Sequence, residues 1–332
     1  MGNMKTTNNK LKYIVIALVI IFLVSTAFLL LEVWENRQGK YPISSTEDGV
    51  LEYNGKEYVL RDNIETFLVL GLDKYEGADS SVSHESGVQT DFLMLFVFDN
   101  EAKQCTAIHI NRDTMTRVNK LAVGGSTIAE IYTKQIALAY NYANADNDKI
   151  KCRNTKDSVE YLLKGIKVDH YLSLTMDAVL ASCDLVGGVE VTVLDDFTGI
   201  DETLVKGEKV TLTGEQALRY VRTRYGLEDS TNSTRMARQQ QYINALYDKI
   251  ESLLEVDDAF LLKLVETMDD YVVYDSSDQR MMQLAEKFKD YEFMGTREID
   301  GESKVVDEFM EFYPNEDSIF DVVIDLFYWP KK

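Results

Sequence analysis

The chain has 332 residues and a formal net charge of -21, and 45% of its residues are apolar. This composition is typical of a folded protein with a sizeable core and excludes an intrinsically disordered chain. The acidic balance also argues against nucleic acid as a partner, because binding to a phosphate backbone requires an extended basic surface.

An uninterrupted apolar run, YIVIALVIIFLVSTAFLLL, occupies residues 13–31. It is long enough to cross a bilayer once and lacks the small-residue cleavage site of a secretory signal, so we expect an uncleaved transmembrane signal anchor. Lysines precede the run and Glu32 follows it. By the positive-inside rule, residues 1–12 are predicted to be cytoplasmic and the rest of the chain external.

Residues 32–62 are predicted to be an extracellular linker, with a short hairpin over Leu51 to Leu60 around the turn signal Asn54-Gly55. The core is predicted to begin after this linker. Cys105, Cys152 and Cys183 are odd in number and irregularly spaced, so we expect small core residues and no disulfide framework.

Strands and helices are predicted to alternate through the next part of the chain. Apolar runs bounded by turn residues predict strands at Phe67–Asp73, Asp91–Asp99, Cys105–Ile110, His170–Leu174 and Val189–Val193. Helical spacing predicts helices at Thr127–Ala143, Ser158–Lys164 and Met176–Val186. We therefore expect an α/β (α+β) fold, in which helices cover a central mixed β-sheet.

Helices are predicted to dominate the second half. Thr213 and Gln216 form a capping box at the start of TGEQALRYV, and a long helix is expected from about Thr234 to Glu255. We expect the main domain to cover residues 63–256. Residues 257–332 are predicted to be a helical part packed on or following it, with helices at Phe260–Met268, Arg280–Phe288 and Ile319–Phe327.

Two aspartates flank the predicted strands. Asp73 ends one strand and Asp91 begins the next. Carboxylates at strand ends project toward the crevice where open sheets bind ligands, and such a pair suits Mg²⁺. A strand-end aspartate is also a common turn residue, so position alone leaves both readings open.

Five arginines lie close together in this acidic chain, at positions 219, 222, 224, 235 and 238. Guanidinium groups match phosphate oxygens, so this density predicts a polyanion site, the alternative being solvated charge at a helix end. In NRDT, Arg112 and Asp113 could form a structural ion pair, or Asp113 could orient Arg112 toward a ligand.

Several motifs together resemble the LytR-CpsA-Psr family of membrane-anchored cell-wall enzymes. In chain order they are the N-terminal anchor, LVLGLD, QTDFLMLF, IHINRDT, LVGGVEV, LTGEQALRYVRTR and RMARQQ. The resemblance implies a phosphotransferase that moves a glycopolymer from a polyprenyl-pyrophosphate carrier to peptidoglycan and forms a phosphodiester. It also implies an apolar tunnel for the lipid tail and a location at the outer face of the membrane in a Gram-positive type of envelope.

The resemblance assigns roles to residues of this chain. Asp73 and Asp91 look like Mg²⁺ ligands, and Asp113 looks like the partner that orients Arg112. The implied pyrophosphate ligands are Arg112, Arg222, Arg224, Arg235, Arg238 and Gln239, and the implied catalytic residues are Arg112, Asp113, Arg222 and Arg224. Candidate tunnel-wall residues, for each of which ordinary core packing is the favoured reading, are Phe67, Leu70, Phe92, Leu95 and Phe96.

Gln89 stands where the family usually has arginine, which removes one positive charge beside the site. Two further functions therefore stay open. One is a non-catalytic, membrane-anchored binder of lipid-linked wall precursors, and the other is a pyrophosphatase that releases the glycan to water. The transferred polymer, whether teichoic acid, capsule or another glycan, is not specified by the sequence.

Overall fold

A computed structural model describes residues 44–45, 50–74, 88–223, 226–227, 232–257, 260–288 and 291–331. The predicted anchor, residues 13–31, lies outside these ranges and stays a prediction. Among the described residues, no helix is both long enough and apolar enough to cross a membrane.

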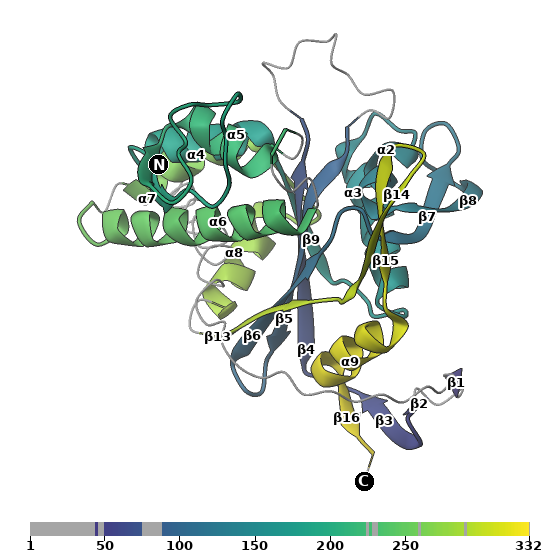
Figure 1. The fold of residues 1–332 in the computed structure, drawn as a ribbon. Coiled ribbons are helices and arrows are strands. Elements are labelled where there is room, and N and C mark those ends of the chain that lie inside the picture. Colours follow the sequence, from purple (N-terminus) through teal and green to yellow (C-terminus); the bar gives the residue numbers. More distant parts are fainter. Residues whose placement is uncertain are drawn as a thin grey trace.

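A mixed β-sheet forms the centre of the described molecule, with strand order β12-β9-β4-β5-β6-β13 (Figure 1). Strand β4 pairs antiparallel with β5 and parallel with β9, and β6 pairs antiparallel with β5 and parallel with β13. The expected fold class is thereby confirmed. The strand bounds are β4 (Ile64–Leu72), β5 (Thr90–Asp99), β6 (Gln104–Ile110), β9 (His170–Thr175), β12 (Val272–Tyr274) and β13 (Glu292–Glu298).

Both faces of this sheet are covered, which explains why its strands are nearly continuous apolar runs in the sequence. Leu68, Leu70, Leu93 and Leu95 pack on one face against a cluster that includes α3 (Asp148–Leu162), η2 (Ile136–Leu138) and α9 (Glu316–Phe327). The alternate residues, such as Phe96, pack on the other face against α8 (Asp278–Phe288). Cys105, Cys152 and Cys183 are buried and free, as predicted.

A helical lobe lies on one side of the sheet and has its own apolar core (Figure 1). It contains α4 (Met176–Leu185), α5 (Gly214–Arg222), α6 (Asn232–Leu254), α7 (Phe260–Met268) and the hairpin of β10 (Val189–Thr192) and β11 (Lys209–Leu212). The predicted capping box is present at the start of α5. Thr213 Oγ1 accepts a hydrogen bond from Gln216 N at 3.3 Å, and Gln216 Oε1 accepts one from Thr213 N at 3.0 Å.

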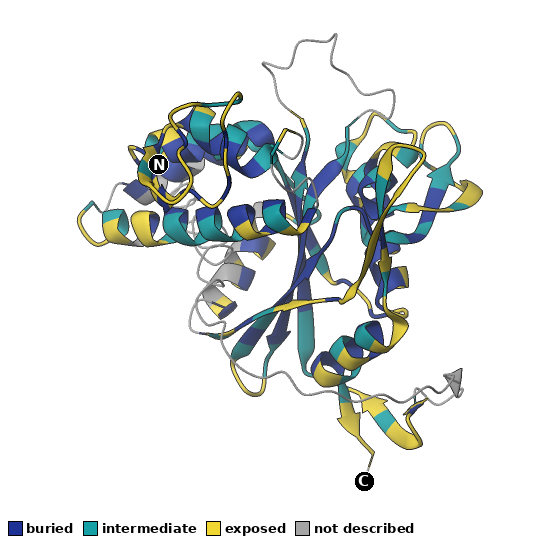
Figure 2. Cartoon of the chain, in the orientation of Figure 1, coloured by how far each residue is buried: buried dark blue, intermediate teal, exposed yellow. Residues whose placement is uncertain are grey.

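Smaller elements surround these layers, and among them the strands Lys56–Leu60, Ile128–Gln135 and Gly301–Val306 are largely exposed (Figure 2). The predicted hairpin at Asn54-Gly55 is confirmed as β2 and β3, with positive φ at both turn residues. The remaining bounds are β1 (Ser44–Ser45), β2 (Val50–Tyr53), β3 (Lys56–Leu60), β7 (Met115–Leu121), β8 (Ile128–Gln135), α2 (Ala139–Tyr142), η3 (Asp269–Tyr271), β14 (Gly301–Val306), β15 (Phe309–Pro314) and β16 (Tyr328–Pro330).

The helix predicted over Thr127–Ala143 is wrong for most of its length. Residues 128–135 form β8, which pairs antiparallel with β7, and the short helices η2 and α2 follow. Ile128 and Ile131 gave the apparent helical spacing, yet both side chains are at least half exposed. Pairing with the preceding strand of the same hairpin therefore overrode a helical pattern that no core supports.

Two other boundaries differ from the prediction. Helix α3 begins at Asp148, ten residues before the predicted start, because Asn147 Oδ1 caps it by accepting hydrogen bonds from the backbone of Lys149 and Ile150. The C-terminal part is not purely helical. It contains the three predicted helices, but β12 and β13 complete the two edges of the central sheet.

Candidate active site

A charged pocket of about 520 Å³ lies where β4 ends, β5 begins and the loop after β6 starts. Because β4 and β5 are antiparallel, the end of one strand meets the start of the other, and Asp73 N donates to Gln89 O at 2.8 Å. Of the predicted site residues, six line this pocket: Asp73, Asp91, Arg112, Asp113, Arg222 and Arg235. Their sequence positions span the chain from 73 to 235, so tertiary folding brings them together.

Asp91 links two of the arginines inside the pocket. Its Oδ1 forms a close ion pair with Arg112 Nη1, and its Oδ2 lies 3.2 Å from Arg235 Nη1. Arg112 Nη2 also donates to Gln89 Oε1. The carboxylate and the amide thus hold the two guanidinium groups at fixed positions, which is the kind of preorganisation that a phosphate site requires.

Asp113 is completely buried next to Arg112. Its Oδ1 lies 3.5 Å from Arg112 Nε and accepts a hydrogen bond from Gln135 Nε2 at 3.3 Å. This is where a residue that orients the guanidinium group would lie. On the opposite wall, Arg222 Nη2 lies 3.1 Å from Asp73 Oδ1.

A pair of buried asparagines connects the loop after β6 to helix α6, and the sequence analysis did not identify it. Asn232 Nδ2 donates to Asn111 Oδ1 at 2.8 Å, and Asn232 Oδ1 accepts from Arg235 Nη2. Asn111 Oδ1 also accepts from Asp113 N at 3.0 Å. The available signal was an asparagine at the start of the arginine-bearing helix, which is a common position for a capping residue.

Arg238 does not lie in the charged pocket, so its position does not fit the predicted role of a pyrophosphate ligand. Its side chain is fully buried, with the guanidinium carbon 5.4 Å from the ring centroid of Phe197 and 5.9 Å from that of Tyr220. Its Nε lies 3.1 Å from Asp195 Oδ2, and its Nη2 donates to Thr223 O. Burial lowers the pKa of Arg238, which Asp195 opposes. The residue ties α6 to the end of α5.

Two further predicted ligands are placed differently. Gln239 donates to Val221 O at 3.3 Å and lines a second, apolar pocket. Arg224 lies outside the described residues, so its role stays a prediction.

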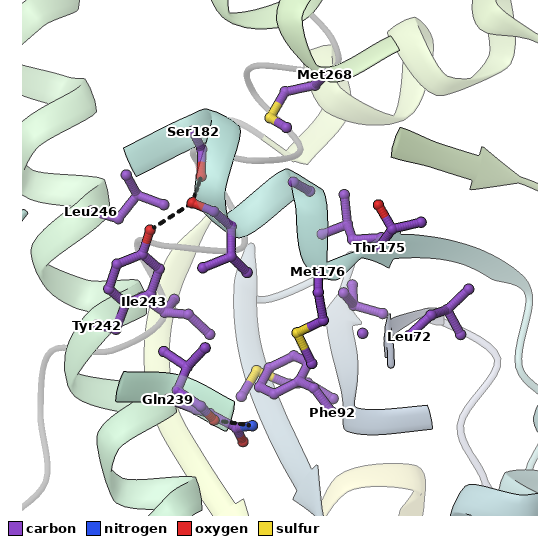
Figure 3. Close-up of a pocket in the computed structure, with 17 residues that line it drawn as sticks. Leu72, Phe92, Thr175, Met176, Ser182, Gln239, Tyr242, Ile243, Leu246 and Met268 are labelled. Atoms are coloured by element: carbon purple, nitrogen blue, oxygen red, sulfur yellow. Dashed lines mark hydrogen bonds between the residues drawn. The ribbon is translucent and has the colours of Figure 1, made fainter. Parts of the chain in front are cut away.

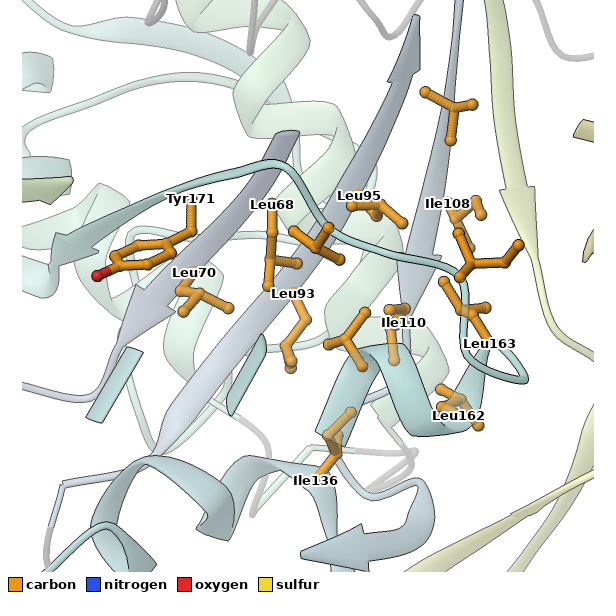
Figure 4. Close-up of a cluster of buried hydrophobic side chains, with 14 of the residues drawn as sticks. Leu68, Leu70, Leu93, Leu95, Ile108, Ile110, Ile136, Leu162, Leu163 and Tyr171 are labelled. Carbon is orange, nitrogen blue, oxygen red and sulfur yellow. The ribbon is translucent and has the colours of Figure 1, made fainter. Parts of the chain in front are cut away.

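The second pocket is almost entirely apolar and has a volume of about 130 Å³ (Figure 3). It lies between the sheet and the helical lobe, and its walls include Phe92, Met176, Val179, Ile243 and Leu246. Of the candidate tunnel-wall residues, Phe92 lines it. Leu70 and Leu95 belong to the core cluster on the opposite face of the sheet (Figure 4), and Phe67 and Phe96 belong to the cluster beneath α8.

The two pockets adjoin each other. Three pairs of chain neighbours contribute one residue to each pocket, namely Leu72 with Asp73, Phe92 with Asp91, and Val221 with Arg222. A ligand with a phosphate part joined directly to a hydrocarbon part therefore matches this arrangement.

His109 lies beneath this junction and does not line the charged pocket. Its ring centroid is 5.0 Å from that of Phe92, and burial, together with the nearby charge of Arg235, lowers its pKa to about 3. The imidazole is therefore neutral at physiological pH, so it adds no charge beside the arginines.

The LytR_cpsA_psr family model matches residues 37–326. The chain belongs to the LytR-CpsA-Psr family.

Relatives and solved structures agree with this family membership. The chain is 31% identical to the polyisoprenyl-teichoic acid--peptidoglycan teichoic acid transferase TagU of Enterococcus faecalis, covering 62% of this chain and 61% of that protein. It is 26% identical to Biofilm regulatory protein A of Streptococcus mutans, covering 73% and 58%. The chain thus spans about three fifths of each of these relatives.

Among solved structures, TagT bound to LI-WTA has a TM-score of 0.55 at 22% identity, covering 80% of this chain and 90% of that one. TagV of B. subtilis has the same TM-score and identity, covering 80% and 97%. These similarities show that the fold is that of LytR-CpsA-Psr proteins.

The described residues contain no cluster of three or more histidine, cysteine or acidic side chains that could hold a metal ion. Mg²⁺ needs only one or two carboxylates when water and phosphate oxygens complete its shell, and Asp73 and Asp91 supply two. The described lining has four acidic residues (Asp73, Asp91, Asp113 and Glu311) and four basic ones (Arg112, Lys134, Arg222 and Arg235), so their formal charges cancel. A bound cation would therefore supply the net positive charge that a pyrophosphate needs in this pocket.

Proposed function

We propose that this protein transfers a glycopolymer from a polyprenyl-pyrophosphate carrier to peptidoglycan, forming a phosphodiester at the outer face of the membrane. The observation that carries the proposal is the closeness of the arginine-lined pocket and the apolar pocket, to which neighbouring residues of three chain segments contribute. A polyprenyl pyrophosphate has the same sequence of parts, a charged group followed by a hydrocarbon chain. The names of the TagU relatives, which specify transfer of teichoic acid to peptidoglycan, point to the same reaction.

The reaction requires charge neutralisation more than covalent help from the protein. In the proposed step, an acceptor sugar hydroxyl attacks the sugar-proximal phosphorus. A new phosphorus–oxygen bond forms, the pyrophosphate bridge breaks, polyprenyl phosphate leaves, and the hydroxyl proton passes to solvent. Arg112, Arg222 and Arg235 would bind the non-bridging oxygens and stabilise the leaving phosphate.

Asp73 and Asp91 would hold Mg²⁺, which supplies additional positive charge to the pyrophosphate when bound. In the structure each carboxylate already pairs with at least one arginine. These arginines would then shift part of their hydrogen bonding from carboxylate to phosphate when the donor binds.

The test uses the full chain in detergent, a polyprenyl-pyrophosphate-linked glycan and peptidoglycan chains, with Mg²⁺ or with a chelator. We expect glycan attached to peptidoglycan only when Mg²⁺ is present. Donor binding without product, across several donor glycans, would instead establish a binding protein, with Gln89 as the first residue to test. Free glycan phosphate in water, with none on peptidoglycan, would establish a pyrophosphatase.

A further inference from the structure

The outer wall of the charged pocket comes from a hairpin that the proposed chemistry does not use. Phe309 and Glu311 of β15 line the pocket together with the arginines. The hairpin β14–β15 lies beside β7, and most of its residues are exposed (Figures 1 and 2). Two of its side chains therefore reach the site from a surface element that faces solvent.

This hairpin is bonded directly to the loop that carries Arg112. Phe312 N donates to Asp113 O at 2.8 Å, and Thr114 forms a parallel bridge with Phe312. Gln135 Nε2 donates both to Met310 O and to Asp113 Oδ1. The position of the hairpin relative to the site is thus fixed by hydrogen bonds to the site itself.

Strand alternation divides β15 into an inner and an outer face. Phe312 is buried on the inner face, whereas Phe309 is 64% exposed and Tyr313 is 40% exposed on the outer face, with Glu311 between them. Strand rise places the two rings roughly 14 Å apart along the strand. We call Phe309, Glu311 and Tyr313 the β15 strip. It begins inside the charged pocket and continues onto the surface.

The charge of the hairpin decides which reactant fits this strip. Residues 301–314 include four acidic side chains (Glu302, Asp307, Glu308 and Glu311) and one basic one, Lys304. An anionic, phosphate-linked polymer would be repelled here. An uncharged sugar chain would not, because its apolar ring faces can stack on the exposed aromatics while its hydroxyl groups donate hydrogen bonds to Glu311.

We propose that the acceptor is an uncharged chain of hydroxyl-bearing sugars and that the β15 strip binds it. The sugar that stacks on Phe309 would then place one of its hydroxyl groups in the charged pocket. The role of this chain as the acceptor rests on the proposed function, whereas the binding of a neutral sugar chain does not. The occupant is defined by the aromatic, acidic chemistry of the strip and by its continuity with the pocket that holds the reacting phosphorus.

The experiment measures binding of a fluorescent hexamer of β-1,4-linked N-acetylglucosamine to the full chain in detergent. We expect saturable binding that Phe309→Ala weakens about five- to tenfold and that the double variant Phe309→Ala/Tyr313→Ala weakens further. The matched control is Tyr161→Ala, which removes a 53% exposed aromatic ring from the surface of α3. This control should bind the hexamer as the unmodified chain does, and circular dichroism should show that every variant is folded.

Absence of saturable binding, or equal binding by the unmodified chain and the double variant, would overturn the proposal. Phe309-dependent binding of a poly(glycerol phosphate) chain in preference to the hexamer would also overturn it, because the strip would then hold the donor polymer.

Two further measurements separate the sugar-binding strip from the proposed transfer reaction. A titration with inorganic pyrophosphate reports on the charged pocket alone, and the transfer assay reports on the reaction. Phe309-dependent hexamer binding without any transfer would remove the proposed reaction and leave a sugar-binding strip. If transfer occurs, Phe309→Ala should raise KM for the acceptor and leave KM for the donor unchanged.

Discussion

Arg219 and Arg222 lie almost one turn apart on α5, yet their guanidinium groups have different surroundings. Arg219 pairs with Asp201 on a loop, whereas Arg222 pairs with Asp73 in the charged pocket. Their side chains are similarly exposed, at 40% and 38%. The same residue type on the same helix thus serves one structural contact and one contact in the candidate site.

These two arginines form a matched pair for mutagenesis. Arg222→Ala should lower the transfer rate by roughly 10²- to 10³-fold, the usual effect of removing one donor that stabilises transition-state charge. Arg219→Ala should leave transfer near the unmodified rate, because Arg219 does not line the charged pocket and pairs with Asp201 instead. The glycan transferred per minute measures both, and equal effects of the two variants would contradict the assignment of Arg222.

At the scale of elements, the site depends on how α5, α6 and the loop after β6 are held together. The capping box fixes the start of α5, Arg238 ties the end of α5 to α6, and the pair of Asn111 and Asn232 connects α6 to the loop. The element that carries each arginine of the pocket is therefore held in place by contacts outside the pocket.

The cap of α5 can be tested by stability. Thr213→Ala removes the side-chain oxygen that accepts from Gln216 N and should lower the free energy of unfolding by about 1 kcal/mol. Thr213→Ser keeps this acceptor and should cost much less. Urea unfolding followed by circular dichroism measures both variants, and a similar loss in both would show that the hydroxyl group is not responsible.

Helix α8 is attached to the central sheet through Glu65 of β4. The Glu65 carboxylate contacts His170 Nε2 at 3.1 Å, Arg280 Nη2 at 3.3 Å and Lys287 Nζ. The hydrogen bond from His170, helped by Lys287, lowers the pKa of Glu65 from 4.5 to about 2. Because the folded pKa is depressed, the stabilisation is complete above pH 4.5 and is lost as the pH falls through about 2.

A pH series on Glu65→Gln tests this contact. The unmodified chain should be more stable than the variant above pH 4.5, and the difference should shrink toward zero as the pH approaches 2. Urea midpoints measured across this range give the comparison. A difference that stays constant with pH would show that the ionisation of Glu65 does not contribute.

At the scale of the whole molecule, the apolar pocket belongs to the interface between the sheet and the helical lobe. Its walls come from β4, β5, β9 and from α4, α5 and α6, whereas the charged pocket lies at the edge of the same interface. The two parts of an amphipathic donor would thus be bound by different layers of one fold.

This separation predicts that the two binding functions can be changed independently. Val179→Phe places a larger side chain in the apolar pocket and should weaken binding of a polyprenyl-pyrophosphate donor by at least about tenfold, since its hydrocarbon part loses room. Inorganic pyrophosphate, which has no hydrocarbon part, should bind as before. Isothermal titration with both ligands makes the comparison, and parallel losses would mean that the substitution disturbs the charged pocket as well.

The sequence by itself determined the buried strands, the capping box, the burial of the cysteines and the gathering of site residues in a few motifs. These features depend on local patterns, which include continuous apolar runs for strands covered on both faces and fixed residue spacing at a helix start. The family also follows from such motifs, and the family model that matches most of the chain confirms it.

Only the tertiary structure decided which arginines face the pocket. Arg235 and Arg238 are three residues apart on α6, but one meets Asp91 and the other meets Asp195, and both carboxylates are distant in sequence. The same limit applies to Ile128 and Ile131, whose helical spacing is overridden by pairing between β7 and β8. The carboxylate partners of the two arginines approach through long-range packing, whereas β8 pairs with the strand just before it in the chain. In each case the partner lies outside the segment, and periodicity within one segment contains no information about it.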